Sequence, residues 1–164
     1  MKKLTIIVFI LMSSCSFEQP TLFSDKALND IVYSEHNNQL TIEKMLEKHK
    51  GKKVFIDVWA SWCGDCVKGL KYVKILQKKY PDVVFLFLSV DKNKVAWKQG
   101  IRRFQISGSH YNLPKGMKNG DFVDFINLNW IPRYMVVDEI GQISLFKATN
   151  AADIDIEKVL NANQ

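Results

Sequence analysis

The stretch Val58-Trp59-Ala60-Ser61-Trp62-Cys63-Gly64-Asp65-Cys66 decides which fold this sequence predicts. A short apolar run, Val54-Phe55-Ile56, precedes it and a long helical pattern follows it, so Cys63 and Cys66 lie at a strand-to-helix junction. The first turn of a helix leaves its backbone N–H groups unpaired and carries a partial positive charge, which stabilises a thiolate there. The second cysteine follows one turn later on the same face, close enough to form a disulfide with the first. The pattern predicts a dithiol pair capable of disulfide exchange.

Two residues outside the pair fit that chemistry. Asp57 lies in an apolar strand pattern six positions before Cys63, where burial raises the pKa of a carboxyl group and lets it take and return the proton of the second thiol. The alternative is a strand-end carboxylate in water. Pro132 follows Ile131 at the start of another apolar strand; a cis bond between them would place backbone groups where an extended substrate chain can pair. A trans, structural proline is the alternative.

On these residues the sequence resembles the thioredoxin superfamily, and most closely its TlpA/ResA-like branch of membrane-tethered bacterial thiol–disulfide oxidoreductases. The resemblance covers about Thr41 to Leu160. It implies an α/β, thioredoxin-like fold with a central mixed β-sheet flanked by helices. Gly69 stands where many relatives have Glu and Lys71 where many have Pro, which leaves Asp57 as the main acid at the site. The positions that match the family pattern are Asp57, Trp59, Ala60, Trp62, Cys63, Gly64, Cys66 and Pro132.

The resemblance implies a thiol–disulfide oxidoreductase in which Cys63 attacks the substrate disulfide and Cys66, activated by Asp57, resolves the mixed disulfide. No metal or organic cofactor is needed, since the redox centre is the Cys63–Cys66 disulfide itself. Asp65 places negative charge beside the forming thiolate and favours the reducing direction. The residues expected to bind the substrate are Trp62, Gly64, Asp65, Ile131 and Pro132.

The N-terminus predicts export. Lys2 and Lys3 precede an apolar segment, Leu4 to Met12, which is too short to span a bilayer but fits a signal peptide. Small residues before Cys15 resemble a lipobox, so we expect a lipoprotein-type signal peptide over 1–14, a lipidated N-terminus and tether over 15–40 and the thioredoxin-like domain over 41–164. Lipidation of Cys15 also leaves an even number of free cysteines. A cleaved signal peptide with an incidental Cys15 is the alternative.

Composition fits a single domain behind the signal peptide, and the lipid anchor predicts a periplasm-facing place in the cell envelope. The 164 residues carry a formal net charge of +6, but the lysines are spread along predicted helix faces and do not alternate with aromatics as in a nucleic-acid groove. No nucleic-acid partner is therefore expected. The expected partners are exported or membrane proteins with disulfides, an upstream electron-donating thiol–disulfide protein and the membrane itself, bound through the N-terminal lipid.

Periodicity predicts the remaining elements. Residues 16–39 are polar and mixed and indicate a tether with little structure, and residues 108–129 indicate loops, near the site, that serve recognition. Trp97, Tyr111 and Trp130 are interpreted as packing residues, with a place in a substrate groove as the alternative. The expected helices cover 41–49, 63–80, 93–104, 121–128 and 153–161, and the expected strands cover 53–59, 83–90, 133–138 and 142–147, the last two forming a hairpin.

Three other functions stay open. A pair of thiolates could carry copper(I), although the histidines that would complete a larger metal site, at positions 36, 49 and 110, are isolated in the sequence. The same pair could act as a disulfide oxidant or isomerase. A non-catalytic adaptor with this fold is the third, and the presence of both cysteines argues against it.

Overall fold

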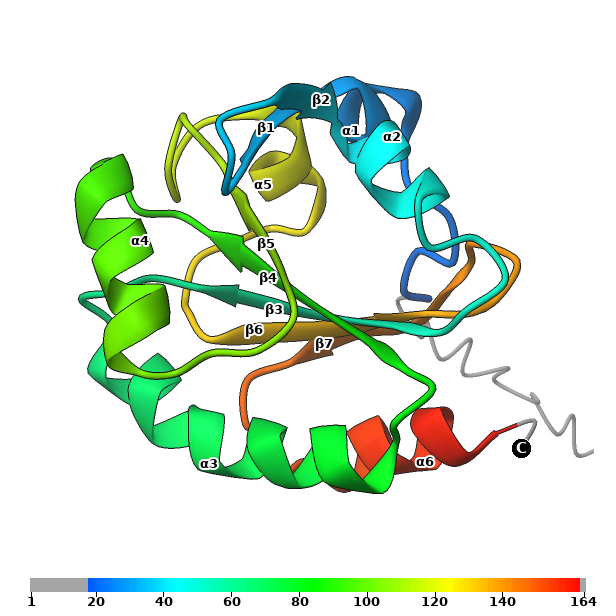
Figure 1. The fold of residues 1–164 in the computed structure, drawn as a ribbon. Coiled ribbons are helices and arrows are strands. Elements are labelled where there is room, and N and C mark those ends of the chain that lie inside the picture. Colours follow the sequence, from blue (N-terminus) through cyan, green and yellow to red (C-terminus); the bar gives the residue numbers. More distant parts are fainter. Residues whose placement is uncertain (1–17, 163–164) are drawn as a thin grey trace, which may run out of the picture.

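The computed structural model describes residues 18–162, so the predicted signal peptide and Cys15 lie outside the described residues. One mixed seven-stranded sheet forms the centre, with the strand order β2-β1-β5-β4-β3-β6-β7 (Figure 1). The elements are, in chain order, α1 (Asp25–Asn29), β1 (Ile31–Ser34), β2 (Gln39–Thr41), α2 (Ile42–Glu47), β3 (Val54–Trp59), α3 (Gly64–Lys79), β4 (Val84–Ser89), α4 (Lys94–Arg103), β5 (Ser109–Asn112), α5 (Asp121–Phe125), β6 (Arg133–Val137), β7 (Ile143–Ala148) and α6 (Ile154–Asn161).

The central strands follow from their apolar composition. β3 pairs in parallel with β4 and antiparallel with β6, and every residue of β3 and β6 is buried. Strands covered on both faces read as continuous apolar runs rather than alternating ones. The predicted fold class, a thioredoxin-like mixed sheet flanked by helices, is confirmed.

Helices cover both faces of this sheet. In Figure 1, α3 and α6 lie below the sheet and α1, α2 and α5 lie above it. α3 runs for 16 residues and buries Leu70, Val73 and Leu76 on one side. The proline at position 81 follows its C-terminus because proline cannot donate the next helical hydrogen bond. The sequence predicted this helix within one residue at each end.

The prediction that residues 15–40 form a tether with little structure is wrong for much of this segment. β1 and β2 form a hairpin, and β1 also pairs antiparallel with β5 through Tyr33 and Asn112. Val32 and Ala27 are fully buried, but the strand and helix that hold them are only four and five residues long, too short to show a periodic pattern in the sequence. Asp30 accepts a hydrogen bond from the backbone N–H of Phe122. The domain therefore begins before residue 41.

The region predicted as loops after residue 108 contains a further strand. β5 runs parallel to β4, and its residues His110, Tyr111 and Asn112 are buried. The Asn112 amide donates to the backbone oxygens of Ser89 and Asp91, so polar contacts to the next strand replace the apolar pattern on which the prediction relied. The hairpin of β6 and β7 is as predicted.

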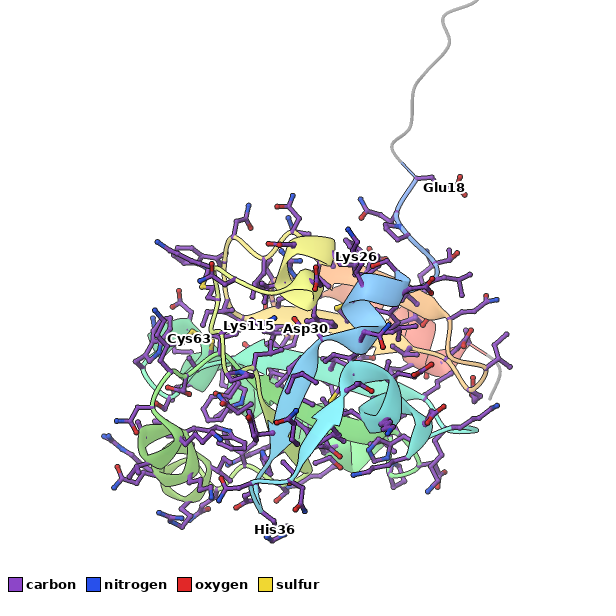
Figure 2. All side chains as sticks on the ribbon, turned by 90° about the horizontal axis from the view of Figure 1, so that it is seen from above. Glu18, Lys26, Asp30, His36, Cys63 and Lys115 are labelled. Atoms are coloured by element: carbon purple, nitrogen blue, oxygen red, sulfur yellow. A yellow bond between two sulfur atoms is a disulfide. The ribbon has the colours of Figure 1, made fainter. Side chains whose placement is uncertain are left out.

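Two observations concern the outer surface of the domain. Figure 2 shows Glu18, the first described residue, and Cys63 on different sides of the molecule. Among residues 18–162, no helix has both the length and the apolar character needed to cross a membrane.

Candidate active site

The two cysteines form a disulfide at the N-terminus of α3. Cys63 and Cys66 are bonded, with their Cα atoms 5.3 Å apart. Cys63 is the N-cap residue of the helix, and its Sγ accepts a hydrogen bond of 3.1 Å from the backbone N–H of Cys66. Cys63 is 6% exposed and Cys66 only 1%. The helix terminus therefore stabilises negative charge on Cys63, the more accessible of the two sulfurs.

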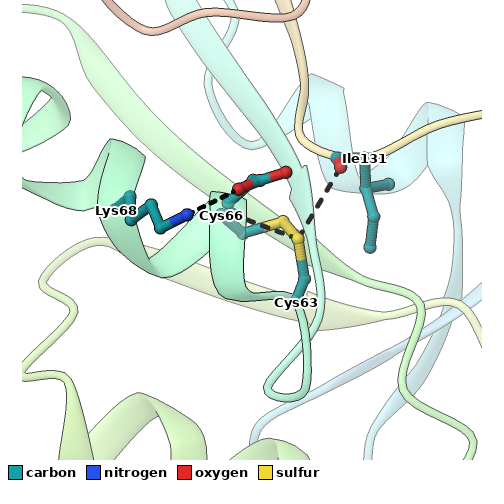
Figure 3. A network of polar contacts seen from close by, with 5 residues as sticks. Cys63, Cys66, Lys68 and Ile131 are labelled. Carbon is teal, nitrogen blue, oxygen red and sulfur yellow. Dashed lines mark hydrogen bonds and ion pairs between the residues drawn. A yellow bond between two sulfur atoms is a disulfide. The ribbon is translucent and has the colours of Figure 1, made fainter.

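The loop before β6 meets this disulfide. The peptide bond between Ile131 and Pro132 is cis, as the sequence analysis expected. The Ile131 carbonyl oxygen lies 3.7 Å from Cys63 Sγ (Figure 3). A disulfide sulfur carries no proton, so this is a packing contact in the oxidised protein, whereas a Cys63 thiol at this position could donate to the carbonyl.

Asp65, the charged residue between the two cysteines, is exposed and forms an ion pair. The Asp65 carboxylate lies 3.1 Å from Lys68 Nζ, one turn along α3. Both side chains are more than half exposed, so the pair adds little to stability. The Lys68 ammonium partly offsets the negative charge that Asp65 places near Cys63.

A cavity of about 250 Å³ opens beside the sulfur of Cys63. Two tryptophans flank it, Trp62 at 64% exposure and Trp130 at 59%. The interpretation of Trp130 as a packing residue is therefore wrong, whereas Trp97 and Tyr111 are buried as expected. The lining residues are Trp62, Cys63, Gly64, Asp65, Met117, Trp130 and Ile131.

Sequence reasoning missed one of these lining residues, Met117, and preferred packing over a place in a substrate groove for another, Trp130. Trp130 had a usable signal, because it stands two positions before Pro132. Met117 had none beyond its place in the 108–129 segment, where recognition was expected. Pro132 itself faces a second cavity, of about 370 Å³, on the other side of Trp130 and Asp65.

Asp57 lies in β3, the strand that precedes the cysteine pair, and is 1% exposed. Burial raises the pKa of its carboxyl group to about 8, the direction that an acid in an apolar strand predicts. Within residues 18–162, neither carboxylate oxygen of Asp57 has a hydrogen-bond partner. A carboxyl group with such a pKa can accept and release a proton near neutral pH.

A polar network holds the loop between β3 and Cys63. Asp91, 2% exposed, accepts hydrogen bonds from the backbone N–H and hydroxyl of Ser61, at 2.8 and 2.7 Å. The Ser89 hydroxyl donates to the same carboxylate at 2.8 Å. These bonds fix the approach of the chain to the cysteine pair. Sequence reasoning missed Asp91, whose only signal was its place just after a buried strand.

Within the part of the chain that the structure describes, no group of three or more His, Cys, Asp and Glu side chains is arranged to hold a metal ion. The cysteine pair is thus a two-sulfur site at a helix terminus. A mixed sheet of this order, a cysteine pair after its central strand and a cis-proline in the loop that contacts the pair define a protein with a thioredoxin-like fold and a dithiol centre.

Comparison with known proteins agrees with that class. The family model described as thioredoxin-like matches residues 51–143, and the chain belongs to this family. A Bacteroides vulgatus protein assigned as a thiol-disulfide oxidoreductase has a TM-score of 0.62 and is 32% identical, and the match covers 79% of this chain and 84% of that one. A thiol-disulfide oxidoreductase from Bacteroides fragilis, with a TM-score of 0.66 and 18% identity over 82% of this chain and 99% of its own, shares the fold.

Curated relatives point to the same branch. The thiol-disulfide oxidoreductase ResA of Bacillus thuringiensis is 26% identical over 101 residues, which cover 60% of this chain and 56% of ResA. The chain thus spans little more than half the length of the curated relatives it matches. The resemblance to the thioredoxin superfamily and its ResA-like branch is confirmed.

Proposed function

We propose that this protein is a thiol–disulfide oxidoreductase that reduces disulfides in exported proteins. The observation that carries the proposal is the Cys63–Cys66 disulfide at the N-terminus of α3, with the Ile131 carbonyl 3.7 Å from the outer sulfur. The helix terminus supplies a reactive thiolate, and the neighbouring backbone offers a strand edge to the substrate.

Reduction proceeds in two exchange steps. The Cys63 thiolate attacks one sulfur of the substrate disulfide; a Cys63–substrate disulfide forms and the other substrate sulfur leaves as a thiolate. Cys66 then passes its proton to Asp57, and its thiolate attacks Cys63 Sγ. The Cys63–Cys66 bond forms, the mixed disulfide breaks and the second substrate thiolate leaves. The substrate gains two electrons and the pair loses two, so an upstream thiol–disulfide protein must reduce the pair again.

The surface around Cys63 supports binding of an extended chain. An open cavity beside Cys63 is lined by Trp62, Gly64, Asp65 and Ile131, and Pro132 orients the loop that carries the Ile131 carbonyl. Backbone groups of the loop pair with the substrate main chain, and Trp62 forms an apolar wall for its side chains. The disulfide is the only redox group this mechanism requires.

Charge supports the reducing direction. A strongly oxidising pair needs its Cys63 thiolate stabilised, because stabilising the reduced form raises the potential. Asp65 opposes that stabilisation, and its exposed partner Lys68 offsets the effect only in part.

The deciding measurement is the reduction potential of the pair, on protein beginning at Ser16 and equilibrated in graded dithiol buffers. A value near −270 mV, that of thioredoxin, supports a reductant, whereas a value near −120 mV identifies an oxidant that installs disulfides. A pair that forms no disulfide in solution overturns the proposal in favour of copper(I) carriage.

Trapping tests the exchange chemistry itself. Cys66→Ser leaves the mixed disulfide unresolved, so this variant should accumulate covalent adducts with substrate proteins that a reducing agent releases. Cys63→Ser is the matched control and should accumulate none. Equal yields from the two variants contradict the assignment of Cys63 as nucleophile.

We further propose that the protein faces the periplasm and is anchored to the cytoplasmic or the outer membrane of a bacterium through a lipid on Cys15. The signal-peptide pattern supports this, as does the separation of Glu18 from Cys63, which leaves the site clear of a tether (Figure 2). Cys15→Ser should move the protein from the membrane fraction to the soluble one; unchanged attachment contradicts lipidation.

A further inference from the structure

Tyr134 lies directly opposite Asp57 in the sheet. The two residues are register partners across the antiparallel pair of β3 and β6. Directly opposite residues project to the same face of a sheet, with their Cβ atoms about 5 Å apart. Tyr134 is fully buried. Burial, and after it the neighbouring Asp57 charge, raises the pKa of the Tyr134 phenol.

The Tyr134 hydroxyl reaches the helix that carries the cysteines. A Cβ atom added at Gly69 would lie 2.5 Å from Tyr134 Oη. Gly69 follows Cys66 by one helical turn, so both positions are on the same side of α3. The hydroxyl therefore occupies space that any side chain at position 69 would fill, between α3 and the strand that holds Asp57.

Neither the Tyr134 hydroxyl nor the Asp57 carboxyl is hydrogen-bonded by the described residues around it. Across residues 18–162, Tyr134 Oη and both Asp57 carboxylate oxygens lack hydrogen-bond partners. Buried polar groups in proteins are almost always paired, either directly or through ordered water. Two such unpaired groups lie side by side on one face of the sheet, and an ordered water molecule typically bridges a pair of this kind.

Tyr134 also lines the 370 Å³ cavity beside Pro132, which is large enough for several water molecules. Asp57 is not among the residues that line it. Tyr134 is therefore the residue that lies between the buried Asp57 carboxyl and this cavity.

We propose that Tyr134 is a positioning residue whose hydroxyl connects Asp57 to the water of this cavity and carries the Cys66 proton to solvent. The proposal rests on the role proposed above for Asp57. During resolution, the Cys66 thiol gives its proton to the Asp57 carboxylate. The Asp57 carboxyl then passes a proton to Tyr134 Oη through the bridging water, and Tyr134 releases its own proton to the cavity. One proton leaves, and both side chains return to their starting states.

The elements around Asp57 and Tyr134 decide which other titratable groups affect the pH dependence of the proton transfer. β4 presents the apolar Phe87 opposite Asp57, and His110 stacks on the far side of that ring. β7 presents Ala148 opposite Tyr134. The groups from α3 are Cys66 itself and the cavity-lining Asp65, Lys68, Lys71 and Tyr72.

Tyr134→Phe isolates the hydroxyl, because the ring and its stacking on Phe55 at 5.5 Å are retained. Reduced protein is mixed with a chromogenic disulfide, dithiobis(nitrobenzoate). Attack by Cys63 releases one chromophore in a step that depends on reagent concentration, and resolution by Cys66 releases the second in a step that does not. Tyr134→Phe should leave the first step unchanged and slow the second about tenfold near pH 8, where about half of Asp57 is ionised and can accept the Cys66 proton. The difference should vanish near pH 10, where Cys66 ionises unaided. Tyr80→Phe, which removes a buried hydroxyl bonded to Asn161, is the matched control and should change neither step.

A double-mutant cycle separates the relay from a loss of structure. In an Asp57→Asn background, Tyr134→Phe should cause no further slowing, because the relay has already lost its proton acceptor. Gly69→Ala keeps the hydroxyl but displaces it, and should slow the second step as Tyr134→Phe does. Equal slowing by Tyr134→Phe with and without Asp57, or an unchanged second step, overturns this inference. An Asp57→Asn variant with a normal second step instead overturns the role proposed for Asp57.

Discussion

Asp30 accepts a hydrogen bond of 3.0 Å from Lys115 Nζ, although the two residues are 85 positions apart in the chain. Figure 2 shows them side by side. The same carboxylate accepts from the backbone N–H groups of Ile31 and Phe122, the latter in the first turn of α5. One buried side chain thus ties the N-terminal hairpin to the segment that supplies Met117 to the substrate cavity.

Replacing this carboxylate should destabilise the domain in a pH-dependent way. Burial raises the pKa of Asp30, but the hydrogen bonds from Phe122, Lys115 and Ile31 outweigh it and hold the pKa below the ordinary value. A lowered native pKa contributes stability above the unfolded-state value, near 3.9, and loses it as the pH falls through the native value. Asp30→Asn should therefore reduce the free energy of unfolding by about 1–3 kcal/mol at pH 7.

Urea unfolding at about pH 7 and about pH 3 measures this effect. The difference in the free energy of unfolding between Asp30→Asn and the wild type should be smaller at the lower pH. Asp25→Asn, at the exposed start of α1, is the control and should change little. If the difference in the free energy of unfolding is the same at both pH values, the Asp30 carboxylate is not its cause.

Asp57 should have the opposite effect on stability. Its native pKa, about 8, lies above the unfolded value, so between about pH 4 and pH 8 the native state holds a proton that the unfolded state has released. Stability contributed by this group is complete below pH 4 and is lost as the pH rises to 8. Asparagine does not ionise, so Asp57→Asn does not lose this stability as the pH rises. The variant should be more stable than the wild type by a few kcal/mol at pH 8, but not at pH 4.

Urea unfolding of the oxidised protein across this range provides the measurement. The same variant should slow resolution by Cys66, so greater stability accompanies lower activity. The free energy of unfolding of the wild type should fall between pH 4 and pH 8 relative to that of Asp57→Asn. If it does not, the Asp57 carboxyl ionises normally in the folded protein.

Asp91 should control the geometry of the loop before Cys63. Asp91→Ala removes an acceptor from the Ser61 backbone, the Ser61 hydroxyl and the Ser89 hydroxyl, and leaves these donors unpaired in a buried site. A loss of about 2–4 kcal/mol in the free energy of unfolding is expected. Ser61→Ala removes only one of the three bonds and should lose about 1 kcal/mol. Thermal unfolding of both variants checks the ranking; equal losses contradict a shared network.

The sequence predicted the parts of the site that are local in the chain. Cys63 and Cys66 follow a buried strand and begin a helix, so their spacing and neighbours determine the disulfide and its place at the helix terminus. The cis bond before Pro132 and the burial of Asp57 were expected from the same patterns, because each depends on residues next to it.

The parts that were missed depend on which distant segments become neighbours. The contact of Tyr134 with the space beside Gly69 follows from the register of β3 against β6, which no local pattern reveals. In the sequence, Gly69 was noted only because many relatives have a glutamate at this position. The structure shows that the absence of a side chain there makes room for the Tyr134 hydroxyl. β1, β2 and β5 were missed because their polar residues are satisfied by contacts across the sheet.

Trp130 should set a preference for apolar substrates. Its exposed ring faces Trp62 across the cavity beside Cys63, and an aromatic side chain at such a position typically contributes about 1–2 kcal/mol to binding, or about tenfold. Trp130→Ala should lower kcat/KM by about tenfold for a peptide disulfide flanked by leucine and phenylalanine, but by less than about twofold for the same peptide flanked by serine. Ile140→Ala, at an even more exposed apolar residue in the β6–β7 turn, should change neither value. Equal losses with both peptides indicate that Trp130 supports the loop rather than contacting the substrate.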